Sequence, residues 1–168
     1  MKKNEIIITS ARRTAVGSLG KSLKKIKAYE LGSTVIKAVI KDSNFPAENI
    51  DEIIMGQVLT GGAGQNPARQ AAIKSGIPKE KPAYVVNQVC GSGLRSIISG
   101  YQSVKLGDSK IVVAGGQESM SLAPHAIHLR NGKKLGDEEL IDTMINDGLW
   151  DAFHGYHMGI TAENVAEK

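Results

Sequence analysis

Short runs of β-branched residues alternate with helix-like stretches through most of this chain, and this alternation constrains its fold more than any other feature. The runs cover residues 5–10, 52–58, 84–89 and 110–114. Each has the length of a buried strand and is bounded by turn-forming residues. Strands that alternate with helices build a parallel sheet through right-handed crossovers. We therefore predict an α/β fold, with a βαβαβαβ order and helices on both faces of a mostly parallel sheet.

The three stretches between these runs carry helix signals. Apolar residues of the first and last stretch recur with a helical period, and the two sets are Leu31, Val35, Ala38 and Val39, then Leu94, Ile97, Ile98 and Tyr101. The middle stretch is marked by its ends, with Asn66 as the N-cap, Pro67 in the first turn and Gly76 after the last turn. We expect an amphipathic helix in each stretch.

The alternation stops after Gly116, which suggests a different kind of structure in the rest of the chain. Residues 119–168 hold all four histidines, several glycines and one expected helix at 161–168. Their apolar content is too low for a separate core. We therefore expect an α/β domain over 1–118 and an irregular segment over 119–168.

Composition excludes several classes of protein. A net charge of +4 suits a phosphate-bearing ligand but lacks the clustered basic stripe of a nucleic-acid binder. No apolar stretch is long enough to span a bilayer, and the first residues lack the core of a signal peptide. The single cysteine has no intrachain partner, so we expect a free thiol in a reducing, cytoplasmic setting.

Cys90 stands where the third expected strand meets the third helix, and Gly91, Ser92 and Gly93 follow it. The N–H groups and dipole at a helix N-terminus stabilise a thiolate there, and a nearby amide can receive an oxyanion. Most unpaired cysteines are simply small buried residues. Spacing alone leaves both interpretations open.

Longer motifs favour the reactive interpretation. The string V-N-Q-V-C-G-S-G-L-R at 86–95 resembles the acyl-acceptor cysteine motif of the thiolase family, in its biosynthetic acetoacetyl-CoA branch. The resemblance continues along the chain in A-R-R-T-A-V-G at 11–17, G-A-G-Q-N-P-A-R-Q-A-A at 62–72, A-G-G-Q-E-S-M-S-L-A-P-H at 114–125, I-D-T-M-I-N-D-G-L at 141–149 and Y-H-M-G-I-T-A-E-N-V-A at 156–166. It implies a thiolase amino-terminal domain over 1–118, followed by the start of the family's loop domain.

The resemblance also implies roles for three residues. Cys90 would be the nucleophile that takes the acetyl group, with its backbone N–H in an oxyanion hole, and His157 and Met158 would line the acyl and pantetheine site. Without it, His157 is an exposed histidine and Met158 a packing residue. The implied substrates are coenzyme A thioesters, with neither a metal nor an organic cofactor, and the full-length parent would form a homodimer or tetramer.

Parts of the thiolase pattern do not occur in this sequence. The family's G-H-P histidine and C-x-G cysteine are missing, and so are the last strand of the first sheet and the carboxy-terminal domain. A nucleophile without its base cannot complete a Claisen condensation. We therefore expect this chain alone to be inactive. The alternatives are a non-catalytic fragment or assembly module, and a degradative 3-ketoacyl-CoA thiolase; the segments 123–134 and 155–159 favour the biosynthetic branch.

Two shorter motifs are weaker. The glycines of 61–64 lack the G-x-G-x-x-G spacing of a dinucleotide site. The H-x-x-H pairs His125 with His128 and His154 with His157 stand among glycine and proline, without a nearby ordered set of further ligands. We expect neither a dinucleotide nor a metal at these positions.

Overall fold

The computed structural model describes residues 5–168 and contains a parallel three-stranded sheet. Its strands are β1 (Glu52–Gly56), β2 (Ala83–Val86) and β3 (Val112–Gly116), in the order β2-β1-β3. Ile54 of β1 is in register with Tyr84 of β2 and Ala114 of β3. The predicted α/β class is confirmed. Each of these strands ends within two residues of its predicted end except β2, which ends at Val86.

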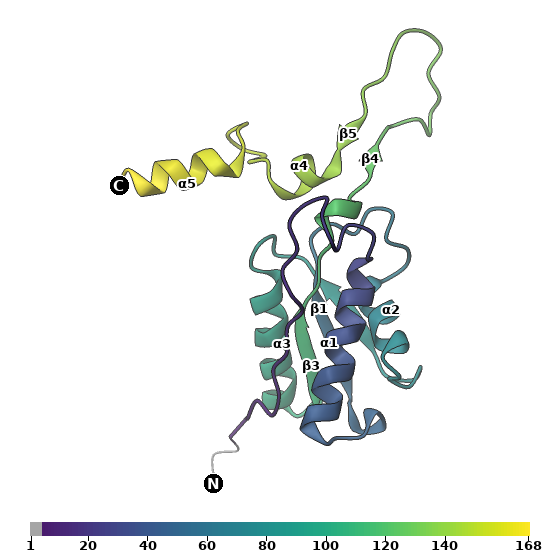
Figure 1. Ribbon diagram of the computed structural model, residues 1–168, viewed down its shortest axis with the longest axis vertical. Coiled ribbons are helices and arrows are strands. Elements are labelled where there is room, and N and C mark those ends of the chain that lie inside the picture. Colours follow the sequence, from purple (N-terminus) through teal and green to yellow (C-terminus); the bar gives the residue numbers. More distant parts are fainter. Residues whose placement is uncertain (1–4) are drawn as a thin grey trace.

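Helices cover both faces of the sheet (Figure 1). On one face α1 (Ala28–Ser43) packs against α2 (Pro67–Lys74), and on the other face α3 (Ser92–Leu106) lies against β3 and β1. A short 3₁₀ turn, η1 (Ala47–Asn49), connects α1 to β1. The helix covering on both faces therefore agrees with the predicted crossovers.

The main hydrophobic core lies between the sheet and the α1–α2 layer. Its buried members come from both helices, from β1 and from the adjoining loops, and they are Ile36, Ile50, Ile53, Met55, Ala68, Ala71, Ala72 and Ile77. The small side chains of α2 allow this helix to approach the strands closely. Asn66 caps α2 as predicted, since its side chain accepts a hydrogen bond from the Arg69 N–H at 3.1 Å.

The segment 5–10 does not form the predicted first strand. It is extended but unpaired, and Ile7 and Ile8 are 73% and 81% exposed. β3 bonds to β1 on one side, and its other edge is free. A groove of about 1260 Å³ lies between this free edge, α1, α3 and residues 5–19. The predicted strand is absent because no hydrogen-bonding neighbour fills the gap between it and β3.

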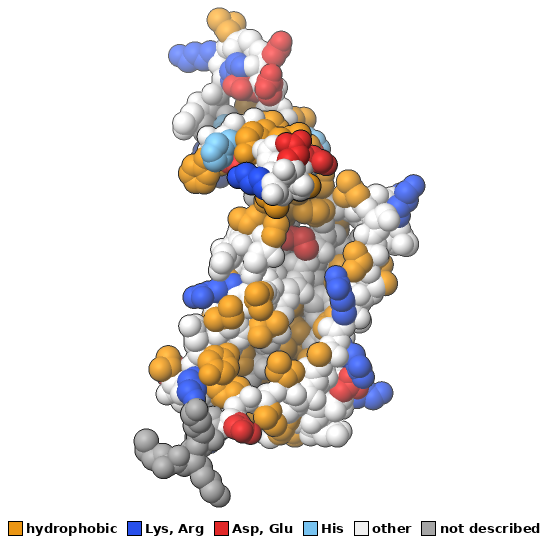
Figure 2. All heavy atoms as spheres, turned by 90° about the vertical axis from the view of Figure 1, so that its left-hand side faces the viewer, with side chains coloured by type: hydrophobic (Ala, Val, Ile, Leu, Met, Phe, Trp, Pro, Cys, Tyr) orange, Lys and Arg blue, Asp and Glu red, His pale blue; other side chains and the backbone are white. Residues whose placement is uncertain are grey.

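The apolar faces predicted for α1 and α3 are not the faces that pack on the sheet. In α3 the buried residues are the small ones, Ser92, Ser96 and Gly100. The predicted face of α3 is exposed, from 39% at Ile98 to 65% at Leu94. Figure 2 shows hydrophobic side chains gathered on the side of the molecule that carries α3. Exposed apolar side chains gathered on one side of a molecule are typical of an interaction surface.

Beyond β3 the chain leaves the three-layer body. It forms the 3₁₀ turn η2 (Met120–Leu122), the antiparallel pair β4 (His125–Ala126) and β5 (Ile141–Asp142), then α4 (Thr143–Gly148) and α5 (Met158–Ala166). In Figure 1 this part extends away from the body, with α5 at its far end. The helix predicted at 161–168 is present but begins three residues earlier. No helix within 5–168 is long and apolar enough to cross a membrane.

Candidate functional site

The carboxyl ends of all three parallel strands meet at one edge of the sheet. Gly56 is in register with Val86 on one side and Gly116 on the other. Polar residues follow each strand at this edge, and they are Gln57, Asn87, Gln117 and Glu118. Crevices outside the carboxyl ends of parallel strands are the usual ligand sites of open α/β sheets. The candidate site is built on this edge.

Cys90 lies on a tight turn between β2 and α3, rather than directly at the end of a strand as predicted. β2 ends at Val86, and residues 87–91 form the turn. Within it, the Gly91 N–H donates to the Gln88 carbonyl at 3.0 Å and the Ser92 N–H to the Val89 carbonyl at 3.1 Å. Val89 has a positive φ of 48°, which is rare for a β-branched residue.

The Cys90 side chain is exposed, so the interpretation as a small core residue is excluded. Gly91 is the N-cap of α3, which places Cys90 just before the first turn of a 15-residue helix. No hydrogen bond among the described residues uses the Cys90 N–H. The thiol is therefore open to solvent, and it stands just before the N-terminus of a long helix.

Glycines in the strands allow this turn to approach the sheet. A Cβ atom on Gly56 would stand 2.4 Å from the Ser92 carbonyl carbon and 2.6 Å from the Gly93 nitrogen. A Cβ on Gly116 would stand 3.3 Å from the Gly93 Cα. Only glycine at position 56 leaves room for the start of α3. Sequence reasoning missed this role, although Gly56 is an unusual residue within a run of β-branched ones.

A buried polar network supports the loop beside the turn. The Gln117 side-chain amide donates to the Gln57 Oε1 at 2.8 Å, and the Gln57 amide donates to the Leu59 carbonyl at 2.9 Å. The Gln117 Oε1 is buried without a hydrogen-bond partner among the described residues. Gln117 stands within the 114–125 motif, but no sequence pattern indicates this buried role.

Glu118 fixes the same loop through backbone contacts. Its carboxylate accepts hydrogen bonds from the N–H groups of Val58 at 2.8 Å and Leu59 at 3.4 Å. Burial raises the pKa of the Glu118 carboxyl above its ordinary value, and these backbone hydrogen bonds oppose the rise. The Asn87 amide donates to the Val58 carbonyl at 3.3 Å, which joins this loop to the Cys90 turn.

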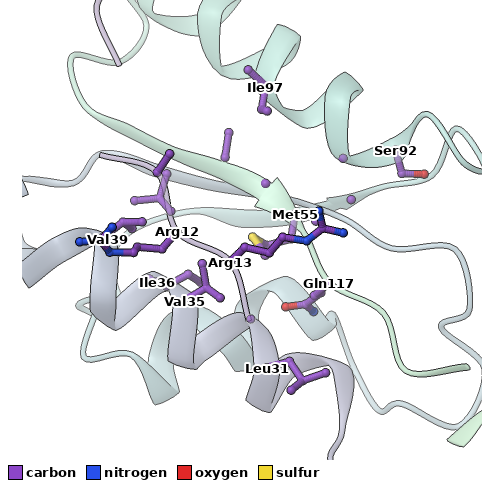
Figure 3. Close-up of a pocket in the computed structure, with 18 of the residues that line it drawn as sticks. Arg12, Arg13, Leu31, Val35, Ile36, Val39, Met55, Ser92, Ile97 and Gln117 are labelled. Atoms are coloured by element: carbon purple, nitrogen blue, oxygen red, sulfur yellow. The ribbon is translucent and has the colours of Figure 1, made fainter. Parts of the chain in front are cut away.

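The groove described above reaches Cys90. Its lining includes Cys90, Ser92 and Glu118 as well as Gly148 and Leu149 from the later part of the chain. Figure 3 shows Leu31 and Val35 of α1 on one side and Ile97 of α3 on the other, with the arginines of the amino-terminal segment between them in this view. The nucleophile candidate is therefore one of the residues that line a largely apolar groove.

His157 and Met158 do not line this groove. His157 is the N-cap of α5, and its Nδ1 accepts a hydrogen bond from the Gly159 N–H at 2.9 Å. Met158 is the first residue of α5 and is 37% exposed. Their predicted place beside Cys90 is not tested by these contacts and stays a prediction.

Within residues 5–168, no cluster of three or more His, Cys, Asp or Glu side chains is arranged to hold a metal ion. Gly62 and Gly64 have positive φ values of 68° and 83°, as in an irregular loop. The three polar residues nearest Cys90 by sequence, Asn87, Gln88 and Ser92, all make hydrogen bonds that shape the turn. The chemistry that this arrangement offers is that of the thiol.

Comparison with known proteins assigns the chain to a family. The family described as "Thiolase, N-terminal domain" matches residues 6–168. An acetyl-CoA acetyltransferase of Rhizobium meliloti is 58% identical over 168 residues, which cover all of this chain but 43% of that protein. The crystal structure of the Bacillus anthracis acetyl-CoA acetyltransferase aligns with a TM-score of 0.90 at 36% identity, over 96% of this chain and 41% of that one.

A third relative was crystallised with a ligand. The Acat5 thiolase of Ascaris suum, solved in complex with coenzyme A, aligns with a TM-score of 0.83 at 40% identity, over 89% of this chain and 39% of that one. The chain thus spans about two fifths of the length of these relatives. Because the family match covers nearly every residue and the structural likeness extends over the same region, this chain belongs to the thiolase family and corresponds to its amino-terminal part.

Proposed function

We propose that the protein to which this chain belongs is an acyltransferase that condenses two acetyl-CoA molecules reversibly into acetoacetyl-CoA and free coenzyme A. The observation that carries the proposal is the exposed Cys90 on a tight turn before α3, whose own N–H donates no hydrogen bond within residues 5–168. The names of the acetyl-CoA acetyltransferases, more than half identical, support the acetyl group as the transferred unit. A relative crystallised with coenzyme A supports a thioester substrate.

The first half of the proposed reaction takes place at the Cys90 turn. The Cys90 thiolate attacks the carbonyl carbon of acetyl-CoA, and the charge that develops on the carbonyl oxygen is placed near the Cys90 N–H. The carbon–sulfur bond to coenzyme A then breaks, and coenzyme A leaves as a thiolate that takes up a proton. The product is an acetyl thioester on Cys90, within reach of solvent and of the groove.

The second half requires groups that this chain does not contribute. A base removes an α proton from a second acetyl-CoA, and the resulting carbanion attacks the acetyl thioester and releases the Cys90 thiolate. We propose that this base lies in the missing carboxy-terminal part, so the chain alone is inactive in condensation. We further propose that His157 and Met158 line the acyl and pantetheine site once α5 packs against that part.

Two exposed surfaces of the chain support a larger whole protein. We propose that residues 1–118 form an amino-terminal domain without its last strand, and that residues 119–168 begin the loop domain. The groove between the free edge of β3 and residues 5–10 has the place and lining for one further strand. The exposed apolar face of α3 would be covered by another domain. We propose a homodimer or tetramer for the whole protein, in a reducing cytoplasm where Cys90 stays a thiol.

Intact-mass spectrometry after incubation with acetyl-CoA tests the proposal. We expect an acetyl adduct that hydroxylamine removes and that Cys90→Ala abolishes. A parallel incubation with a longer acyl-CoA separates the acetyl-specific reading from a degradative 3-ketoacyl-CoA thiolase. If no adduct forms even when the carboxy-terminal part of the Rhizobium relative is added, the chain is an assembly module and the proposal is wrong.

A further inference from the structure

The Ser92 hydroxyl closes the turn that carries Cys90. It accepts a hydrogen bond from the Gln88 N–H at 2.8 Å and donates one to the Val89 carbonyl at 2.6 Å. Ser92 is only 3% exposed, so water does not replace these bonds readily. In the sequence Cys90 stands between Val89, to which the hydroxyl is bonded, and Ser92, the first residue of α3.

The residue before Cys90 needs such support. Val89 has a φ of 48°, and the left-handed region is unfavourable for a β-branched side chain. Packing does not impose this conformation, since the Val89 side chain is 43% exposed. Hydrogen bonds surround it instead: its N–H donates to the Asn87 Oδ1 at 2.9 Å, and its carbonyl accepts from both the hydroxyl and the N–H of Ser92.

We propose that Ser92 is a positioning residue, whose hydroxyl holds Val89 in the left-handed region and thereby fixes the turn that carries Cys90 just before α3. Strain maintained by surrounding structure is typical of functional sites. When the hydroxyl is lost, the Gln88 N–H loses its acceptor and Val89 relaxes toward an ordinary φ. The peptide that joins Val89 to Cys90 rotates with this change, and the exposed thiol is displaced from the place that the turn gives it before α3.

This inference rests on Cys90 as the nucleophile, but its test measures thiol reactivity and not acyl transfer. The alkylation rate of Cys90 by iodoacetamide is followed across a range of pH in the chain and in Ser92→Ala. We expect alkylation near neutral pH to be about three- to tenfold slower in the variant, because a helix terminus stabilises an adjacent charge by that order. The rate should be lower across the whole range of pH, because the thiol is displaced.

Ser96→Ala is the matched control. Ser96 is fully buried one turn further along the same helix, and its hydroxyl donates to the Gly93 and Gly115 carbonyls at 2.7 Å. The substitution removes a buried hydroxyl and its hydrogen bonds without touching the turn. We expect its alkylation profile to match that of the unaltered chain. An equal fall of the alkylation rate in both variants would show that Ser92 acts on helix stability alone, and the proposal would be wrong.

Val89→Gly tests the route. Glycine adopts a positive φ without steric cost, so the turn should no longer depend on the hydroxyl. We expect Ser92→Ala in a Val89→Gly background to alkylate within about twofold of Val89→Gly alone. This pair also serves if Ser92→Ala alone fails to fold. If the double variant alkylates as slowly as Ser92→Ala, the proposed role of Val89 is wrong. Slower alkylation of Ser92→Ala in a chain that forms no acetyl adduct would refute only the proposed acyl transfer.

Discussion

Replacing Gly56 by alanine should disturb the Cys90 turn from beneath. The new Cβ would lie 2.4 Å from the Ser92 carbonyl carbon, whereas ordinary contacts begin at 3.4 Å. The start of α3 must therefore move by about 1 Å, and the atoms that must move belong to the backbone. Overpacking of this kind costs about 1–3 kcal/mol.

Gly115→Ala provides the comparison within the same sheet. Gly115 is in β3, and a Cβ there meets no atom within 4 Å. Alanine at an open strand position is more favourable than glycine by about 0.5–1 kcal/mol. We expect the free energies of unfolding of the two variants to differ by about 1.5–4 kcal/mol, with Gly56→Ala the less stable.

Two assays measure these effects. Urea unfolding followed by far-UV circular dichroism gives the free energies, and iodoacetamide alkylation gives the accessibility and ionisation of Cys90. The alkylation rate should fall in Gly56→Ala and stay unchanged in Gly115→Ala, because only Gly56 lies under Ser92. If both variants unfold at the same urea concentration and alkylate equally, the close approach of α3 to the sheet does not position the thiol.

Three further predictions concern other parts of the chain. Burial raises the pKa of Glu118, so the folded chain holds that proton to higher pH than the unfolded chain, and stability falls as pH rises through the raised pKa. Glu118→Gln should remove this dependence of the free energy of unfolding on pH, measured by urea unfolding at a series of pH values. Asn66→Ala should cost about 1–2 kcal/mol in urea unfolding through loss of the α2 cap, and Asn66→Gly less, because φ at Asn66 is 39°. Leu94→Glu, at a position 65% exposed, should change the free energy of unfolding of this chain by no more than about 0.5 kcal/mol. It should weaken the association of the chain with the carboxy-terminal part of a relative, measured by calorimetry. A large loss of stability would show that this face is already packed.

Local signals in the sequence predicted the elements that local interactions determine. Asn66 and Pro67 gave the start of α2 because a cap and a fixed φ act within one helical turn. The alternation of strand and helix gave the parallel sheet for a similar reason, since short crossovers leave few topologies. The predicted place of Cys90 before α3 is confirmed on the same grounds.

Contacts between distant segments were beyond the sequence patterns. The close approach of Gly56 to Ser92 joins residues from different elements, and no spacing rule reports it. Valine prefers extended backbone, so strand propensity predicts a strand that continues to Val89. In the structure β2 ends at Val86, and Val89 has a positive φ. The loop that Glu118 holds depends on a buried carboxylate, whereas glutamate is usually found at the surface.

The predictions that were wrong have one physical cause. The sequence predicts a strand over 5–10 and an apolar face of α3 with Leu94, Ile97, Ile98 and Tyr101, yet both groups are largely exposed. Apolar periodicity reports the surroundings for which a sequence was selected, and this chain spans 43% of its Rhizobium relative. The unpaired segment, the free edge of β3 and part of α3 border one groove, and the remaining α3 residues face outward beside it. We propose that these patterns describe burial in the whole protein, and that the exposed surfaces of this chain are where its other parts pack.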